Sequence, residues 1–247
     1  MKKLNVKLIE ELVKNGYTDS QIADILKCNK DSISRLRSTE KFGINTEKRL
    51  NNDILISEKI FSILIGTLLG DSSLRVSENS IYPSFSCEHG FKQKEYCQYK
   101  FKLLYELNPT FSYYKRKTVD IRTNKLYESY VIRTKSNSNY KIIYDNMYIN
   151  NKKRITDFLL TYYTEQSLAL HFMDDGSKSQ RSYTLATNCF PLEDLLKFKN
   201  FLYYKWNIET TIFSSNVMYI KANSKKLFEH LILPYVHESM LYKIHVS

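Results

Sequence analysis

Two short segments of this chain carry the residues best placed to do chemistry. Residues 62–74 read SILIGTLLGDSSL and residues 167–178 read SLALHFMDDGSK; each is an apolar helical run that ends in an acid, Asp71 or Asp175, followed by a small residue. A carboxylate at a helix C-terminus lies where the helix dipole is already negative and favours cations. Two such conflicts at matching places indicate a paired carboxylate site that a divalent metal ion neutralises.

Small residues in the two helices predict how the carboxylates come together. Gly66 and Gly70 lie on one face of the first helix, and Ala169 reduces the bulk of the second. Because small residues let two helix backbones approach closely, the helix ends that carry Asp71 and Asp175 are expected to lie side by side.

The ligands available at these helix ends are all oxygens. They are the carboxylates of Asp71 and Asp175 and the backbone carbonyls of Gly70 and Asp174. Oxygen ligands in small number suit Mg²⁺ or Mn²⁺ better than zinc, because Mg²⁺ keeps several waters and accepts substrate phosphates. The sequence therefore predicts a Mg²⁺ site in which Mn²⁺ can substitute.

Net charge and composition limit the classes of binding partner and the cellular location that we expect. The 247 residues carry a formal charge of +11, which favours a polyanionic partner, with nucleic acid ahead of an anionic membrane surface. No apolar run is long enough to span a bilayer, and the N-terminal residues return to charge too early for a secretory signal. The four cysteines show no zinc-binding spacing and are interpreted as reduced thiols. If the source is a bacterium or phage, we expect a cytoplasmic, nucleoid-associated protein; an organellar location stays open.

Residues 1–45 are predicted to form a small all-α helix-turn-helix domain, with its second helix at Asp19–Leu26 and its third running from about Lys30 to Ser38. The stretch GYTDSQIADILKCNKDSISRLR resembles that family over its full length. The expected small core is Ile22, Ile25, Leu26, Ile33 and Leu36. Side chains suited to a DNA major groove are Lys30, Ser34, Arg35 and Arg37. The alternative is a three-helix packing module that does not contact DNA.

The rest of the chain reads as a linker, 46–56, and a larger domain, 57–247, whose halves 57–149 and 150–247 repeat one pattern. Each half is predicted to run α-β-β-α-β-β-α, which is an α+β fold with antiparallel sheets. Expected helices are 57–70, 91–107, 138–147, 165–174, 191–205 and 224–233, and expected strands are 81–87, 111–118, 126–133, 183–188, 209–213 and 217–221.

Basic side chains gather at the ends of the predicted strands. An antiparallel sheet that helices cover on one face and that is basic on the other can lie along DNA. The alternative is an ordinary solvated sheet face. The basic residues assigned to this surface are Arg75, Lys115, Arg116, Lys117, Arg133, Lys135, Lys178, Arg181 and Lys221.

The segments LIGTLLGDS at 64–72 and LALHFMDDG at 168–176 resemble the two motifs of single-chain LAGLIDADG homing endonucleases. The eighth motif position is Asp in both, so the resemblance implies that Asp71 and Asp175, and not the Asp174 side chain, are the catalytic metal-binding acids. The stretch NNKKRI at 150–155 and the stretch MLYKI at 240–244 resemble the family's two lysine segments, which implies active-site roles for Lys153 and Lys243.

Two details of the resemblance bear on individual residues. The proline usual after the first lysine segment is absent, so Lys152 stays an alternative to Lys153. The stretch LATNCF at 185–190 resembles a strand end that often carries Gln, which implies a DNA contact for Asn188.

The resemblance also implies the fold and the activity. The expected fold is a pseudo-twofold tandem repeat whose sheets form a DNA-binding saddle. The expected protein is a monomeric, metal-dependent endonuclease of intron homing that cleaves both strands of a long DNA target and leaves short 3′ overhangs. Two alternatives stay open on the same fold: an intron RNA maturase and a non-catalytic DNA-binding regulator.

Overall fold

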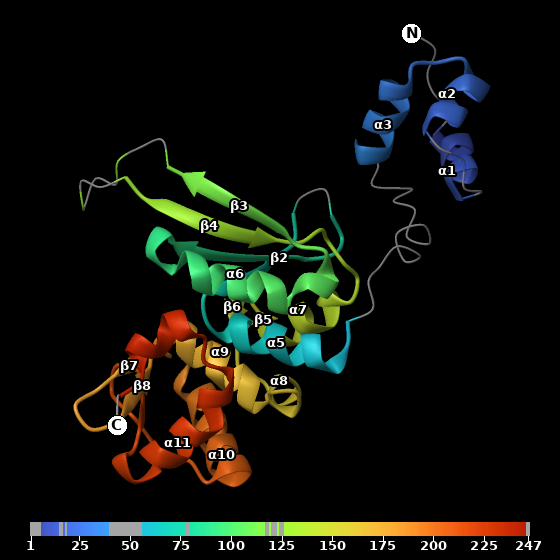
Figure 1. Cartoon of the computed structure of the whole chain (residues 1–247). Coiled ribbons are helices and arrows are strands. Elements are labelled where there is room, and N and C mark those ends of the chain that lie inside the picture. The colour runs from blue at the N-terminus through green and yellow to red at the C-terminus, as the bar shows by residue number, and fades with distance from the viewer. Residues whose placement is uncertain are drawn as a thin grey trace. The chain divides into compact units, whose positions relative to one another are not determined.

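The computed structural model divides the chain into two compact units, residues 1–53 and 54–247 (Figure 1). The described residues are 6–14, 17, 19–39, 56–77, 80–116, 119, 123 and 126–245. The predicted linker 46–56 lies outside them apart from Ile56.

The N-terminal unit contains three short helices, α1 (Val6–Lys14), α2 (Asp19–Leu26) and α3 (Lys30–Thr39). Asn29 caps α3, since its Oδ1 accepts the backbone N–H of Asp31 at 2.8 Å. The buried core is formed by Ile9, Val13, Ile22, Ala23 and Ile33.

The prediction that Ile25 belongs to this core is wrong. Its side chain is 51% exposed, whereas Leu26 and Leu36 pack against the core and are partly buried. Ile22 already fills the inward position on α2, and Ile25, three residues later, lies at the edge of that helix face.

The larger unit repeats one sheet. The first sheet has the order β1-β2-β4-β3 and the second the order β7-β8-β10-β9, and every neighbouring pair is antiparallel. The predicted α+β fold with doubled antiparallel sheets is therefore confirmed. The strands are β1 (Ser72–Arg75), β2 (Ser84–Gly90), β3 (Thr110–Lys115), β4 (Glu128–Arg133), β7 (Gly176–Lys178), β8 (Tyr183–Leu185), β9 (Thr210–Ile212) and β10 (Met218–Ile220).

Helices pack on these sheets. In Figure 1, α6 (Lys94–Leu103) runs along the first sheet, where it contacts β2 and β4. The remaining helices are α5 (Glu58–Leu69), α7 (Tyr140–Met147), α8 (Asp157–Thr161), α9 (Glu165–Asp175), α10 (Leu192–Trp206) and α11 (Lys225–Ile232). Short 3₁₀ turns are Phe91–Gln93, Tyr105–Leu107, Ala222–Ser224, Leu233–Tyr235 and Glu238–Lys243.

Some predicted bounds are wrong. The helix expected at 91–107 is α6 flanked by two 3₁₀ turns, and the strand expected at 81–87 is shifted to Ser84–Gly90. The hairpin of β5 (Tyr148–Ile149) and β6 (Lys152–Lys153) and the five-residue helix α8 were not anticipated, because elements of two to five residues are too short to show a period.

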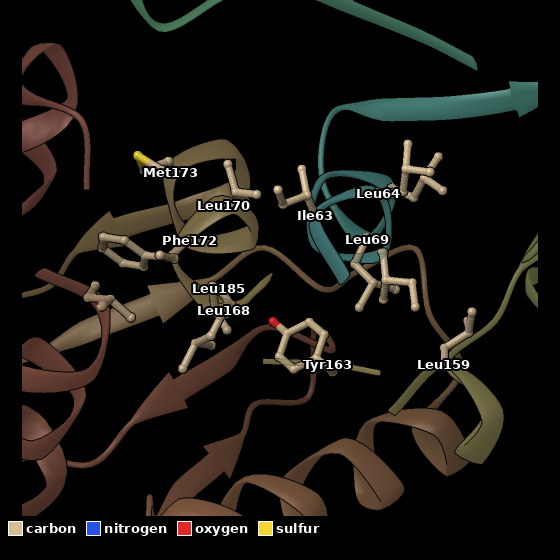
Figure 2. Packing of buried hydrophobic residues seen from close by; sticks show 14 of the residues in the cluster. Ile63, Leu64, Leu69, Leu159, Tyr163, Leu168, Leu170, Phe172, Met173 and Leu185 are labelled. Atoms are coloured by element: carbon tan, nitrogen blue, oxygen red, sulfur yellow. The ribbon is translucent and has the colours of Figure 1, made fainter. Parts of the chain in front are cut away.

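The helices α5 and α9 lie at the centre of one hydrophobic core shared by both halves. Figure 2 shows Ile63 on α5 and Leu170 on α9 pointing toward one another, while Phe172 points away from α5 into the second half. Since both motif helices are buried on several sides, their ends are held rigidly by packing.

Candidate active site

The ends of α5 and α9 approach closely because Gly66 in α5 and Gly70 at its C-cap have no side chains. A Cβ on Gly66 would lie 2.5 Å from the Ser167 Cα, and a Cβ on Gly70 would lie 2.4 Å from the Asp174 Cβ. Real Cβ atoms do not approach neighbours so closely, so both positions require glycine. The close approach expected from these two glycines is present.

Asp71 and Asp175 stand at the two helix ends. The Asp71 side chain is 39% exposed and Asp175 is partly buried, so both carboxylates keep a path to solvent. Burial, followed by the charge of Asp71, raises the pKa of Asp175 to about 6. Burial and the charge of Asp174 also raise the pKa of Asp71. The helix ends therefore hold negative charge that the protein stabilises poorly by itself.

A divalent cation fits this donor set. Two carboxylates with raised pKa values and a nearby helix C-terminus form a negative region of oxygen ligands, which hard cations prefer. The residues that would hold such an ion are Asp71 and Asp175.

Each helix end also receives a lysine. The Lys153 Nζ donates to the carbonyls of Leu68, Gly70 and Ser72 at 2.8, 3.2 and 2.7 Å. Burial lowers the pKa of Lys153, while its side chain satisfies carbonyls that the end of α5 leaves without an intrahelical partner. Lys152 is exposed on the same short strand, and it is the Lys153 ammonium that reaches the helix end.

The second lysine repeats this arrangement. The Lys243 Nζ donates to the carbonyls of Met173 and Asp174 at 2.6 and 2.9 Å, and burial lowers its pKa. The carbonyls of Gly70 and Asp174, predicted as metal ligands, thus both accept a lysine N–H. A carbonyl oxygen has two lone pairs, so a metal-binding role for either stays a prediction.

The Asp174 side chain is a buried hydrogen-bond acceptor for residues of the first half, a role that the sequence did not reveal. It is buried and accepts from Lys100 Nζ at 2.6 and 2.7 Å, from Tyr96 Oη at 2.7 Å and from the backbone N–H of Asp71 at 3.2 Å. Burial opposes its ionisation, but the Lys100 charge and the hydrogen bonds from Lys100 and Tyr96 act together to lower the pKa of Asp174.

Lys100 itself is 1% exposed, and the Asp174 charge raises its pKa against the effect of burial. Lys100 lies on α6 in the first half, so this buried ion pair joins the two halves beneath the helix ends. A lysine among the buried positions of an amphipathic helix was the available signal, but a lysine at such a spacing is more often exposed.

A buried histidine completes the cluster. His89, on β2, is 2% exposed, and its Nδ1 lies 3.6 Å from Asp71 Oδ2. Suitable ligand atoms of Asp71, His89 and Asp174 all lie within 4.8 Å of one another. No sequence pattern pointed to His89.

Most residues assigned to the DNA surface are exposed: Arg75, Lys115, Arg116, Arg133, Lys135, Lys178, Arg181, Asn188 and Lys221, with Lys30, Ser34 and Arg35 in the N-terminal unit. Lys115 pairs with Glu128 at 3.0 Å, and Lys221 pairs with Glu209 at 2.9 Å. The Asn188 side chain donates to the Ser215 carbonyl at 2.6 Å. Lys117 and the side chain of Arg37 lie outside the described residues.

None of the helices in the described part of the chain combines the length and apolar character needed to cross a bilayer.

Comparison with known proteins supplies the family. A family model for the LAGLIDADG DNA endonuclease family (LAGLIDADG_2) matches residues 61–228, which include both helix ends and both sheets. The chain is 27% identical over 233 residues to the cytochrome b mRNA maturase bI2 of Saccharomyces cerevisiae, a match that covers 87% of this chain and 54% of that relative. The chain thus spans about half the length of that maturase.

Two further matches are similar in extent. A probable intron-encoded endonuclease 1 of Wickerhamomyces canadensis is 29% identical over 198 residues, covering 73% of this chain and 81% of that protein. The solved structure of the homing endonuclease I-WcaI bound to its DNA recognition sequence has a TM-score of 0.71 and 24% identity, and it covers 83% of this chain and 96% of that one. At this identity the structural likeness shows the fold.

Proposed function

Because the chain belongs to the LAGLIDADG DNA endonuclease family, we propose that it is a monomeric homing endonuclease that cleaves both strands of a long DNA target. The observation that carries this proposal is the paired site itself. Two partly exposed carboxylates, Asp71 and Asp175, stand at adjoining helix ends, and each end holds a lysine, Lys153 or Lys243.

Each half of the site is suited to one DNA strand. A divalent ion bound at Asp71 or Asp175, Mg²⁺ or in its place Mn²⁺, would supply Lewis acidity toward a phosphodiester and acidify a water nearby. The Lys153 and Lys243 ammonium groups are anchored on backbone carbonyls, so they present fixed positive charge to the negative charge that develops on the phosphate. Two such centres would cleave both strands and leave short 3′ overhangs.

The exposed basic side chains on the strands supply the long contact with DNA. A formal charge of +11 makes binding salt-dependent, because each neutralised phosphate releases counterions. Arg75, Arg133 and Lys178 are exposed on β1, β4 and β7 and are assigned to phosphate or base contacts.

A second function has a specific observation in its favour: a relative that matches 87% of this chain is named an mRNA maturase. An RNA-binding role would use the same fold without strand cleavage, and a non-catalytic DNA-binding regulator would do likewise. An assay for DNA cleavage therefore distinguishes the endonuclease from the RNA maturase and from the non-catalytic regulator.

The deciding experiment is incubation of the protein with a library of random DNA sites and Mg²⁺, followed by sequencing of the cut ends. On the selected site, Asp71→Asn and Asp175→Asn should each slow single-turnover cleavage at least ~10³-fold while binding persists, because the amide keeps the shape but loses the charge that holds the ion. Asp145→Asn, at an exposed pair with Lys141, is the control that should cleave normally. A library without enriched cuts, together with tight binding of intron RNA, would favour the maturase.

The N-terminal unit is proposed to bind DNA through the α3 side chains Lys30, Ser34, Arg35 and Arg37. Deleting residues 1–45 should leave cleavage at saturating protein unchanged, because both carboxylates and both lysines lie in the other unit. Target affinity should fall, and the slope of log K against log[salt] should flatten by about 0.9 per lost phosphate contact. Equal slopes for the intact and truncated proteins would assign these helices to another partner.

A further inference from the structure

We propose that His89 is a metal ligand, so that the first half of the site binds its divalent ion through an imidazole nitrogen and the second half does not. This inference rests on the proposed metal-dependent function and names the ligand set and metal preference of one half. It places a mixed nitrogen and oxygen site at Asp71, which favours Mn²⁺, Co²⁺ or Zn²⁺, and an oxygen site at Asp175, which favours Mg²⁺.

The Nδ1 nitrogen of the His89 imidazole faces the Asp71 carboxylate. His89 is 2% exposed, and its Nδ1 has no hydrogen-bond partner among the residues that the structure describes. A buried polar nitrogen left in this state is costly, and native structures rarely tolerate one without a function. The atom that Nδ1 faces is Asp71 Oδ2, at 3.6 Å.

The separation suits a shared ion. Two ligand atoms that each lie about 2.1 Å from one ion are about 3.0–3.6 Å apart at ordinary ligand angles. The 3.6 Å between His89 Nδ1 and Asp71 Oδ2 is at the long end of that range, so the pair can bind one ion with a small movement of the exposed Asp71 side chain.

Neighbouring groups also orient the imidazole. Its other nitrogen, Nε2, lies 3.2 Å from Cys87 Sγ and 4.0 Å from Asp174 Oδ1. A metal-binding histidine usually directs its second nitrogen toward such an acceptor, which fixes the tautomer.

Asp174 is not itself a ligand in this site. Both of its carboxylate oxygens accept hydrogen bonds from Lys100, and one also accepts from Tyr96. The site therefore consists of Asp71 and His89, with water or substrate oxygens in the remaining positions.

Within the described residues of the second half, the matching position carries no imidazole. The residue after each acid marks the register: Ser72 pairs with Cys87, and Gly176 pairs with Leu185. Two residues further along the chain from Cys87 and Leu185 are His89, still on β2, and Thr187, just after β8. The Thr187 hydroxyl donates a hydrogen bond to the Asn216 carbonyl at 2.6 Å, and threonine offers no imidazole nitrogen to a metal ion.

The test is metal binding to the intact protein without DNA. Pulsed electron paramagnetic resonance of bound Mn²⁺ should show coupling to a histidine nitrogen in the wild type, with ¹⁵N-histidine labelling to identify it. Coupling should persist in Asp175→Asn and vanish in Asp71→Asn. This measurement on the wild type does not depend on any variant folding.

Variants then assign the nitrogen. His89→Gln should abolish the coupling and weaken calorimetric Mn²⁺ or Zn²⁺ binding to the first half at least roughly tenfold, with Mg²⁺ binding nearly unchanged. His89→Asn, which returns an oxygen near the place of Nδ1, should recover part of the Mn²⁺ affinity without nitrogen coupling. Thr187→Ser, at the matched position of the second half, should leave both readouts unchanged.

The outcomes separate this inference from the proposed endonuclease. Mg²⁺-dependent cleavage by a protein whose bound Mn²⁺ shows no nitrogen coupling overturns the role of His89 alone. Coupling that survives in His89→Gln also overturns it. Nitrogen-coupled Mn²⁺ in a protein that cleaves no site in the library supports the metal site and rejects the endonuclease.

Discussion

The two halves of the larger unit share one fold but support their helix ends differently. Both present an acid, Asp71 or Asp175, and both anchor a lysine on the last carbonyls of the motif helix. The residue before the acid differs, because Gly70 has no side chain and Asp174 extends into the first half. The repeat thus keeps the acids and lysines at the helix ends and varies the residues beneath them.

This difference makes the halves interdependent. Because Gly70 leaves room, the Asp174 carboxylate reaches Lys100 and Tyr96 on α6 of the other half. The same carboxylate accepts the backbone N–H of Asp71, so an acid of the second half positions the acid of the first. Residues that differ between the two halves therefore add a buried ion pair to the hydrophobic core that the halves share.

The largest effect is expected from breaking the buried ion pair between Lys100 and Asp174. Lys100→Met should destabilise the protein by about 3–5 kcal/mol, because it leaves the buried Asp174 charge uncompensated. Chemical denaturation at pH 7 measures this change. Lys141→Met removes a lysine from an exposed ion pair and is the control, with an expected change within about 0.5 kcal/mol.

A double variant sharpens the result. Lys100→Met combined with Asp174→Leu removes both charges, so it should be more stable than Lys100→Met alone. If the single and double variants were equally unstable, the loss would come from packing around α6 and not from an unpaired charge.

The close approach of α5 and α9 should give the next largest effect. Gly66→Ala should cost about 2 kcal/mol, because its Cβ would lie 2.5 Å from the Ser167 backbone and the two helices must separate. Gly90→Ala is the matched control, since a Cβ there meets nothing within 4 Å and its φ of −60° suits alanine. Equal thermal unfolding of the two variants would contradict the interpretation of the contact.

The sequence predicted the parts of the site that repeat. The glycine spacing in α5, the acid at each helix end and the basic strands each leave a local pattern that is readable without a structure. Lys153 and Lys243 were identified only through the family resemblance, because isolated lysines carry no spacing signal. Their positions at the helix ends are now visible as contacts with backbone carbonyls.

The parts that differ between the copies could not be predicted. Lys100, His89 and Asp174 come from α6, β2 and α9, and their partnership depends on tertiary packing between the halves. Ile25 was misassigned for a different reason: it lies at the edge of the inward face of α2, and the core of the small N-terminal unit does not cover it.

The two lysines offer a smaller comparison between the halves. Lys153→Met should destabilise the protein by about 1–2 kcal/mol and Lys243→Met by less, since Lys153 satisfies three carbonyls and Lys243 two. Denaturation in the presence of a chelator measures both changes without metal. A larger effect at Lys243 would show that contact number does not set the contribution of each lysine.

The smallest effect is expected from the ionisation of Asp175, and its sign follows from how the free energy of unfolding changes with pH. The pKa of Asp175 is raised from 3.8 to about 6 by burial and then by Asp71, so its ionisation is harder in the folded state than in the unfolded chain. Without metal, this carboxyl therefore lowers stability as pH rises from about 4 to about 6, and the loss persists above that range.

Asp175→Asn should accordingly match the wild type below about pH 4 and exceed its unfolding free energy by about 1 kcal/mol at pH 7, a figure reduced for solvent screening. The neighbouring acid should behave oppositely. Burial opposes the ionisation of Asp174, but the Lys100 charge and the hydrogen bonds from Lys100 and Tyr96 together lower its pKa. Asp174→Asn should therefore lose stability at pH 7 and approach the wild type as pH falls through that lowered pKa. Urea titrations with a chelator at pH 4 and pH 7 test Asp175→Asn, and titrations at pH 7 and below pH 3.8 test Asp174→Asn. If both substitutions shifted stability in the same direction at pH 7, Asp174 would not be the ionised partner of Lys100, and the contrast between the halves would lose its electrostatic basis.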